Sequence, residues 1–186
     1  MKQIILIRHA NVDSDNSQKI DSSRLKIWVE SYDTAKIVAD SLPTQETINI
    51  ANNADVLLTS RLKRAIDSAK VLGVNIDERN ALFNEALIPE VNIPILKLKP
   101  KHWLVILRLM LFLGLGKKDT SLKASKTQAK EAAHKLLEFT TEYDHVVLVG
   151  HGGMNWLIRQ VLVKKGWKLE GKGSHENLGV SVLRLR

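Results

Sequence analysis

Two histidines and two arginines follow apolar runs of the chain, and together these residue types suit chemistry on a phosphorylated anion. They are Arg8, His9, Arg64 and His151. The planar guanidinium of an arginine can bond two phosphoryl oxygens at once. A neutral imidazole can attack phosphorus when its other ring nitrogen is held by a hydrogen bond. We therefore interpret His9 as a nucleophile and Arg8 as the group that holds an anion beside it.

Buried strands are needed to bring these side chains together. Continuous aliphatic runs are typical of strands buried on both faces, as in a parallel sheet. Stretches rich in aliphatic residues predict strands at 3–7, 54–58, 146–149 and 180–185. Open α/β sheets bind their ligands at the carboxyl ends of their strands. The glycines in Gly150-His151-Gly152-Gly153 let the backbone turn tightly there and approach a ligand closely.

Helical patterns fill the intervals between these runs. Apolar residues recur at helical spacing over 28–42, 62–72, 129–137 and 154–162. Pro43 and Gly73 are the stop signals of the first two helices. Residues 11–23 are polar and predict a loop that leaves the crevice, and residues 74–86 predict a short extended segment. The alternation predicts an α/β fold, a three-layer α/β/α arrangement with a mainly parallel sheet, formed by residues 1–186 as a single domain.

The junction between the second run and its helix carries an unusual group of basic residues. Ser60, Arg61, Lys63 and Arg64 lie where a helix begins. A helix N-terminus has free N–H groups and a positive dipole end, so acidic residues are normally preferred there. The basic residues therefore favour an anion site at this junction. A solvated basic turn remains the alternative for Lys63 and Arg61.

An apolar run at 103–115 is interrupted by Arg108 and Gly114. It is shorter than the roughly 20 residues that a membrane-spanning helix needs. A buried helix is the commoner explanation, and a lid over the crevice is the next. An interfacial helix flanked by Lys99, Lys101, Lys117 and Lys118 ranks behind both. We expect a helical lid or insertion around residues 99–120, with no transmembrane segment.

Composition limits the class of protein. The 186 residues include no cysteine, which excludes disulfides and cysteine-ligated metal sites and favours an intracellular location. The N-terminal apolar run is too short for a signal peptide, so we expect a cytoplasmic protein. No Asp or Glu stands at ligand spacing with the two histidines, and the arginines would repel a cation. We therefore expect no metal.

The net charge of +8 is unevenly distributed. Residues 1–90 carry a net charge of −2, and residues 91–186 carry +10. A positive half suggests an anionic partner: a phosphorylated substrate, nucleic acid or a lipid surface. Most of these lysines fit a solvated loop and one helix face. The basic stretches lack interleaved aromatic residues, so nucleic acid is not expected.

Three blocks of the sequence resemble the signature blocks of the histidine phosphatase superfamily, the phosphoglycerate mutase-like proteins. They are Ile7-Arg8-His9-Ala10, Ser60-Arg61-Leu62-Lys63-Arg64-Ala65 and Gly150-His151-Gly152. Their order and spacing match across nearly the whole chain. The resemblance implies that His9 is the phosphorylated nucleophile, and that Arg8, Arg64 and His151 form the phosphate pocket, with His151 also counted as catalytic.

The resemblance also implies a carboxylic general acid between the second and third blocks. Glu85 lies where that acid is expected, and Glu90 is the reserve candidate. We add Asn11 to the phosphate-binding residues, because it begins the polar loop that leaves the crevice. No cofactor is implied.

The resemblance implies a metal-independent phosphatase that hydrolyses a small phosphomonoester through a phosphohistidine on His9. Two alternatives stay open: mutase-type phosphoryl transfer, and a binding module that holds a phosphorylated ligand without turnover. The chain departs from the family pattern at Ala10, Asn11 and Arg61. It also lacks the Gly and Trp-Glu-Gly pattern that mutases have after the acid, which counts against mutase activity. The physiological substrate and the oligomeric state stay open.

Overall fold

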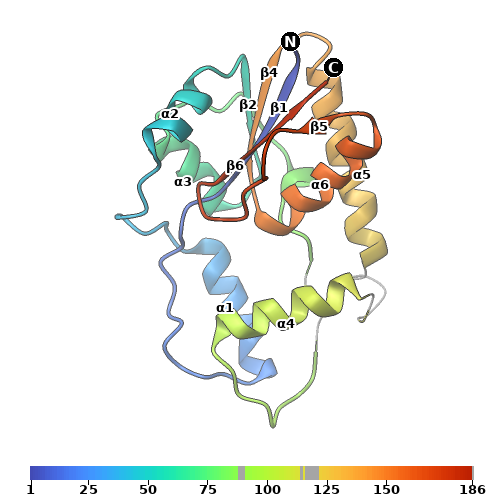
Figure 1. Cartoon of the computed structure of the whole chain (residues 1–186). Coiled ribbons are helices and arrows are strands. Elements are labelled where there is room, and N and C mark those ends of the chain that lie inside the picture. Colours follow the sequence, from blue (N-terminus) through green and yellow to red (C-terminus); the bar gives the residue numbers. More distant parts are fainter. Residues whose placement is uncertain (88–90, 114, 116–121, 186) are drawn as a thin grey trace.

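A computed structural model describes residues 1–87, 91–113, 115 and 122–185, apart from the side chains of residues 111 and 112. Its centre is a six-stranded sheet with the order β3-β2-β4-β1-β6-β5 (Figure 1). Strands β1, β2, β3 and β4 run parallel, and β6 pairs antiparallel with both β1 and β5. The strand bounds are Gln3–Arg8 (β1), Val56–Thr59 (β2), Glu78–Arg79 (β3), His145–Gly150 (β4), Lys168–Leu169 (β5) and Val180–Arg184 (β6).

Helices cover both faces of this sheet. Ile4, Leu6 and Leu148 face α5 and α6 in one apolar core, and Ile5 and Ile7 face α2 and α3 in another. The central strands are apolar on both faces because each face is buried. The helix bounds in these two layers are Gln45–Asn52 (α2), Lys63–Val71 (α3), Leu122–Phe139 (α5) and Gly152–Lys164 (α6), with a short 3-10 turn (η1) at Ala81–Phe83.

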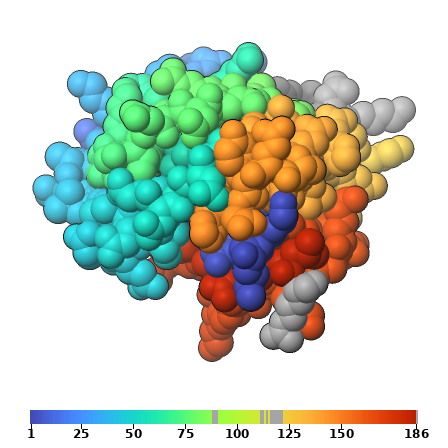
Figure 2. All heavy atoms as spheres, turned by 90° about the horizontal axis from the view of Figure 1, so that it is seen from above, coloured from blue at the N-terminus to red at the C-terminus, as the bar shows by residue number. Residues whose placement is uncertain are grey.

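Two further helices lie beyond the carboxyl ends of the central strands. They are α1, Ser22–Thr34, and α4, Pro100–Phe112, which cross each other below the sheet in Figure 1. Leu25, Trp103 and Leu107 form their own small apolar core. Figure 2 looks onto the opposite end of the molecule, where the start of β1, in dark blue, lies beside the orange segment that leads into β4. We call α1, α4 and the residues 91–99 the lid region.

The predicted three-layer α/β/α architecture with a mainly parallel sheet is confirmed, and the helix predicted over 28–42 is wrong at both ends. Helix α1 begins at Ser22 because Asp21 caps it by accepting from two backbone amides. It ends at Thr34 because the following residues pair with the chain after His9. Val12 and Ile37 form an antiparallel bridge, and the Val38 amide donates to the Asn11 carbonyl at 2.8 Å. Helix α2 and strand β5 were not predicted.

The apolar run predicted as a buried helix or a lid forms α4. Trp103 and Leu107 are fully buried, but Val105 and Leu109 are 62% and 58% exposed. The helix is therefore a lid helix with one covered face, and it is not part of the main core. Residues 114 and 116–121 of the expected insertion, like Glu90, lie outside the described residues. No helix in the described ranges is long and apolar enough to cross a membrane.

Candidate active site

The carboxyl ends of neighbouring strands bring the predicted residues together. His9 follows β1, His151 follows the adjacent strand β4, and Arg64 lies in the first turn of α3 after β2. The backbone amide of His9 donates to the Gly150 carbonyl at 2.9 Å, which extends the pairing of the two strands to the site. The two imidazole centroids lie 5.2 Å apart. All three side chains are nearly completely buried, with exposed fractions of 3% or less.

The His9 ring is held in one tautomer. Its Nδ1 lies 2.7 Å from the Ala10 carbonyl oxygen, which can only accept. Nδ1 therefore carries the hydrogen, and Nε2 keeps its lone pair. Burial is the main cause that lowers the pKa of His9 well below its usual value, and the nearby His151, Arg64 and Arg8 lower it further. His9 is thus a neutral imidazole at neutral pH, the form that can attack phosphorus.

The backbone around His9 is anchored by side chains from two distant elements. Asn177 Nδ2 donates to the His9 carbonyl at 2.8 Å, and the Ala10 amide donates to Ser68 Oγ at 2.8 Å. Ser68 Oγ in turn donates to the carbonyl of Arg64 at 2.6 Å. These bonds connect the end of β1 to α3, so the position of His9 is tied to that of Arg64.

The tautomer of His151 is set by a chain of hydrogen bonds. Arg64 Nε donates to His151 Nδ1 at 3.3 Å, and an arginine cannot accept. Nε2 of His151 therefore carries the hydrogen and donates to Ser60 Oγ at 2.7 Å. Burial lowers the pKa of His151 well below its usual value, and the charges of Arg64, Arg8 and Arg108 lower it further. His151 is neutral and orients Arg64.

The two arginines differ in how they are held. Arg64 Nη1 donates to Asp33 Oδ1 of α1 at 2.6 Å, and its guanidinium lies 4.9 Å from the centroid of the Tyr32 ring. Arg8 donates through Nη1 to the carbonyl of His175, but its Nε is buried and has no partner among the described residues. A buried guanidinium N–H without an acceptor is costly. Arg8 therefore has a donor available for an anion.

Glu85 lies at the N-terminus of α6. Its carboxylate accepts from the Met154 amide at 2.9 Å and the Gly153 amide at 3.4 Å, and Arg108 of α4 lies 3.4 Å away. A β-carbon on Gly153 would come within 2.8 Å of Glu85 Oε1, so only glycine leaves room for this approach. The carboxylate satisfies the free amides of the first helical turn.

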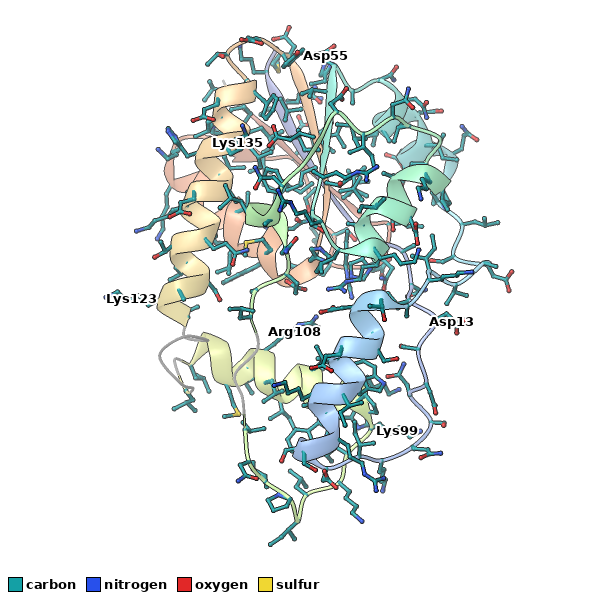
Figure 3. The ribbon with its side chains drawn as sticks, turned by 180° about the vertical axis from the view of Figure 1, so that it is seen from behind. Asp13, Asp55, Lys99, Arg108, Lys123 and Lys135 are labelled. Atoms are coloured by element: carbon teal, nitrogen blue, oxygen red, sulfur yellow. The ribbon has the colours of Figure 1, made fainter. Side chains whose placement is uncertain are left out.

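A cavity of about 290 Å³ lies over this end of the sheet. Arg8 and Arg108 give its wall two fixed positive charges, and Figure 3 shows Arg108 between α4 and the sheet. The other lining residues are Gly152, Gly153, Trp156 and His175. Its size and charge suit a small anionic ligand. A larger groove of about 970 Å³ runs between α5 and α6, and the lysines along it are Lys123, Lys126, Lys130, Lys164 and Lys165.

Some predicted residues lie elsewhere. Asn11 is exposed, and its backbone amide donates to Ser41 Oγ at 2.9 Å. Arg61 is exposed, and Lys63 pairs with Asp67 of its own helix, as expected for a solvated basic turn. The role of Asn11 in phosphate binding stays a prediction.

Sequence reasoning missed the residues that hold the predicted ones in place. Ser60 lies inside the second sequence block, and this placement was a usable signal that its hydroxyl belongs to the site. Asp33 and Arg108 gave no such signal, because their partners are 31 and 23 residues away. His175 lies in a loop whose path past Arg8 depends on the pairing of β6 with β1.

Metal-ligating side chains do not gather at this site. Within residues 1–87, 91–113, 115 and 122–185, no group of three or more His, Cys, Asp or Glu side chains is placed to hold a metal ion. The two histidines engage arginine, serine and backbone partners instead.

Comparison with known proteins identifies the fold. No family model matches the sequence, and no curated protein matches it significantly. A mycobacterial glucosyl-3-phosphoglycerate phosphatase in complex with VO3 has a similar structure, with a TM-score of 0.61 and 14% identity over 98% of this chain and 90% of that one. Phosphoserine phosphatase from Entamoeba histolytica with 3-phosphoglyceric acid gives a TM-score of 0.58 and 15% identity, again over 98% and 90% of the two chains.

These similarities define a class by its fold. The chain shares the fold of these solved phosphatase structures, which agrees with the fold that the three sequence blocks predicted. At 14% to 15% identity the likeness concerns the fold, so the activity has to be argued from the site.

Proposed function

We propose that the protein is a metal-independent phosphatase that hydrolyses a small phosphomonoester through a phosphohistidine on His9. One observation carries the proposal. The hydrogen bond from His9 Nδ1 to the Ala10 carbonyl leaves Nε2 unprotonated, while the buried guanidinium of Arg64 and the half-buried one of Arg8 lie near the ring. A nucleophile with its lone pair fixed in direction, beside fixed positive charge, is suited to in-line attack on a phosphoryl group.

The first half-reaction transfers the phosphoryl group to His9. Nε2 attacks phosphorus, the Nε2–P bond forms, and the bond between phosphorus and the leaving oxygen breaks. Arg8 offers its unpartnered Nε to a phosphoryl oxygen, and Arg64 stabilises the charge on another. His151 keeps Arg64 in the orientation that this requires. The leaving oxygen takes a proton from Glu85 and departs as an alcohol.

The second half-reaction releases phosphate. Glu85 takes a proton from a water molecule, the water oxygen attacks phosphorus, and the bond to Nε2 of His9 breaks. The approach of the carboxylate to Gly153 and Met154 supports this role, because it holds Glu85 beside Gly153, which lines the cavity together with Arg8 and Arg108. Two arginines supply the positive charge that a metal provides in other phosphatases, which supports metal independence.

Turnover of a generic aryl phosphate in EDTA tests the proposal. Wild type should hydrolyse it, and His9→Ala should lose nearly all activity because no other group replaces the nucleophile. His134→Ala is the matched control, because His134 is exposed on α5 and remote from the strand ends. Equal rates for wild type and His9→Ala would overturn the proposal and favour a module that only binds phosphorylated ligands.

The intermediate has its own signature. Phosphohistidine is labile in acid and stable in base, unlike a phosphoserine. Rapid acid-free quenching with a radiolabelled substrate should label wild type and leave His9→Ala unlabelled. With a labelled aryl phosphate, whose leaving group needs little help from an acid, Glu85→Gln should accumulate label, since loss of the base slows hydrolysis of the intermediate. Label that survives acid would place the phosphoryl group on another residue.

A further inference from the structure

Helix α4 carries apolar side chains on two faces, and only one of them is covered. Trp103 and Leu107 pack against α1 and are at most 1% exposed. On the other side, Val105 is 62% exposed and Leu109 is 58% exposed. A helix that is apolar all round is normally surrounded by protein or lipid. We therefore expect the outer face of α4 to be covered by a binding partner.

The exposed apolar surface continues into the loop before α4. Ile95 is 94% exposed, with Ile93 and Leu96 at 42% and 39%. Of the fifteen exposed large apolar side chains in the described part of the chain, eight lie between residues 93 and 115. Single exposed apolar residues are ordinary, but a concentration in one element marks an interaction surface.

Positive charge is interleaved with these apolar residues. Lys97, Lys99 and Lys101 stand between Leu96 and the start of the apolar part of α4, and the sequence from 91 to 118 holds no Asp or Glu. Figure 3 shows Lys99 at one end of α4 and Lys123 beyond the other. A partner for this surface has to be both apolar and anionic. The surface of a bilayer with anionic lipids offers both.

We propose that residues 93–101 and the outer face of α4 dock on the surface of an anionic lipid bilayer. The 13 residues of α4 span about 20 Å, which is shorter than the roughly 30 Å hydrocarbon layer. The helix lies along the interface, with Val105 and Leu109 among the acyl chains and Lys99 and Lys101 at the headgroups. The lid region forms one end of the molecule in Figure 1, so this end can approach a flat surface.

Arg108 connects the proposed docking surface to the candidate active site. This residue lies on the docked helix, and its guanidinium contacts Glu85 at 3.4 Å. A bilayer that fixes α4 therefore also fixes one wall of the cavity. Binding to lipid needs no turnover, so it can fail or succeed independently of the proposed phosphatase activity.

Flotation with lipid vesicles tests the docking surface. The full chain should float with vesicles of equal parts phosphatidylcholine and phosphatidylglycerol and remain at the bottom with phosphatidylcholine alone. Leu109→Ser should weaken the partition about tenfold, the effect of withdrawing one leucine from an apolar medium. Leu42→Ser is the matched control, since Leu42 is 74% exposed between α1 and α2 and lies outside the proposed surface. Equal losses in the two variants would overturn the proposal.

The lysines give a second test. Lys99→Gln and Lys101→Gln should each weaken binding about fivefold, and added salt should weaken wild type. Lys164→Gln with Lys165→Gln is the control, because it removes two charges from the groove between α5 and α6. If this pair loses binding and the lid variants keep it, the protein binds lipid through the groove and the proposal is wrong.

The absence of cysteine allows a direct measurement of orientation. Leu109→Cys carrying an environment-sensitive fluorophore should shift to the blue on addition of anionic vesicles, and Leu42→Cys should not. Sedimentation without lipid provides the competing result. If wild type forms a dimer that Leu109→Ser dissolves, and the Leu109→Cys label shifts without lipid, a second copy covers the face and the proposal is overturned.

Discussion

The end of the sheet and the lid region differ in how firmly they hold their residues. At the sheet, His9 and His151 have their hydrogen-bonding ring nitrogens directed by partners, and both sit at the end of strands with fully buried centres. In the lid region, the apolar cluster has three buried side chains, and the other apolar residues packed against them are only partly buried. The first region holds its side chains within the large core of the sheet, whereas the second has a small core of its own and is expected to open at a lower free energy.

Two ion pairs cross between these regions in opposite directions. Arg64 of the sheet side reaches Asp33 on α1, and Arg108 on α4 reaches Glu85 on the sheet side. Each pair ties one residue of the proposed mechanism to the lid region. In that proposal the strand ends hold the reacting groups, and α1 and α4 orient two of them.

Loss of Arg64 should have the largest effect. In Arg64→Gln, the proposed phosphate pocket loses one of its two arginines, and His151 and Asp33 lose their partner. Removing one such stabilising group typically costs about a hundred- to a thousandfold in rate, and we expect the upper end here. Steady-state kcat/KM on an aryl phosphate measures it. Arg61→Gln, exposed in the same turn, should behave like wild type, and similar losses in both would contradict the assignment.

Acid should lower the free energy of unfolding through the two buried histidines of the site. The pKa values of His9 and His151 are lowered in the folded protein, mainly by burial and then by neighbouring cationic groups. In the unfolded chain both titrate near 6.5. The unfolded state therefore binds more protons below about pH 6.5, and the free energy of unfolding falls there, while above that pH neither histidine contributes.

Urea unfolding at about pH 5 and at about pH 7.5 measures this dependence. The double variant His9→Gln with His151→Gln should show a smaller loss between the two pH values than wild type. His134→Gln, at an exposed site on α5, should leave the loss unchanged. For the same reason the neutral nucleophile persists below pH 6.5, so the acid limb of kcat/KM should lie below that value. An acid limb above it would contradict a lowered pKa of His9.

A cavity made in the core of the lid region should lower the stability of that region alone. Trp103 is fully buried and donates through Nε1 to the Ile20 carbonyl at 2.7 Å. Trp103→Ala should cost about 3–5 kcal/mol of the lid's own stability, with KM raised several-fold and the sheet intact. Leu148→Ala, in the centre of β4, is the comparison and should lower the global free energy of unfolding instead. Amide hydrogen exchange distinguishes the two, and loss of protection throughout the sheet in Trp103→Ala would show that the regions are not separate.

The same contrast explains what the sequence could predict. The strand ends follow from local patterns, because an aliphatic run followed by Arg8-His9 or by Gly150-His151 has few other arrangements. The periodicity over 28–42 misled the prediction at Ala39 and Leu42. Those residues lie after α1 has ended, in a segment that is held by pairing with the loop after His9. In that segment, pairing with a distant part of the chain determines the structure, and the local helical pattern does not.

The lid could not be derived to the same depth. The apolar run at 103–115 indicated a helix but did not reveal which face would be covered, since both faces are apolar. Partners such as Asp33 for Arg64 and Arg108 for Glu85 depend on how α1 and α4 are placed against the sheet. The position of Glu85 between two blocks was predictable from the resemblance, but its seat on the α6 amides was not.

Substitutions at two neighbouring glycines should separate the effect of proton transfer by Glu85 from the effect of anion binding by Arg8. A β-carbon on Gly153 would lie 2.8 Å from Glu85 Oε1, whereas one on Gly152 would lie 3.3 Å from Arg8 Nε. Gly153→Ala should therefore displace Glu85 and lower kcat about tenfold, the low end for a misplaced proton-transfer group. Gly152→Ala should raise KM only a few-fold, because the Arg8 side chain can give by a few tenths of an ångström.

A double variant shows whether the Gly153→Ala effect runs through Glu85. When Glu85→Gln has already removed the proton-transfer group, adding Gly153→Ala should cost almost nothing further, since residues in contact are not additive. Alanine is also the better helix former at this first-turn position, so loss of α6 stability cannot produce the effect. If Gly153→Ala slows Glu85→Gln as much as it slows wild type, the β-carbon acts on another group, and Glu85 is only a cap of α6.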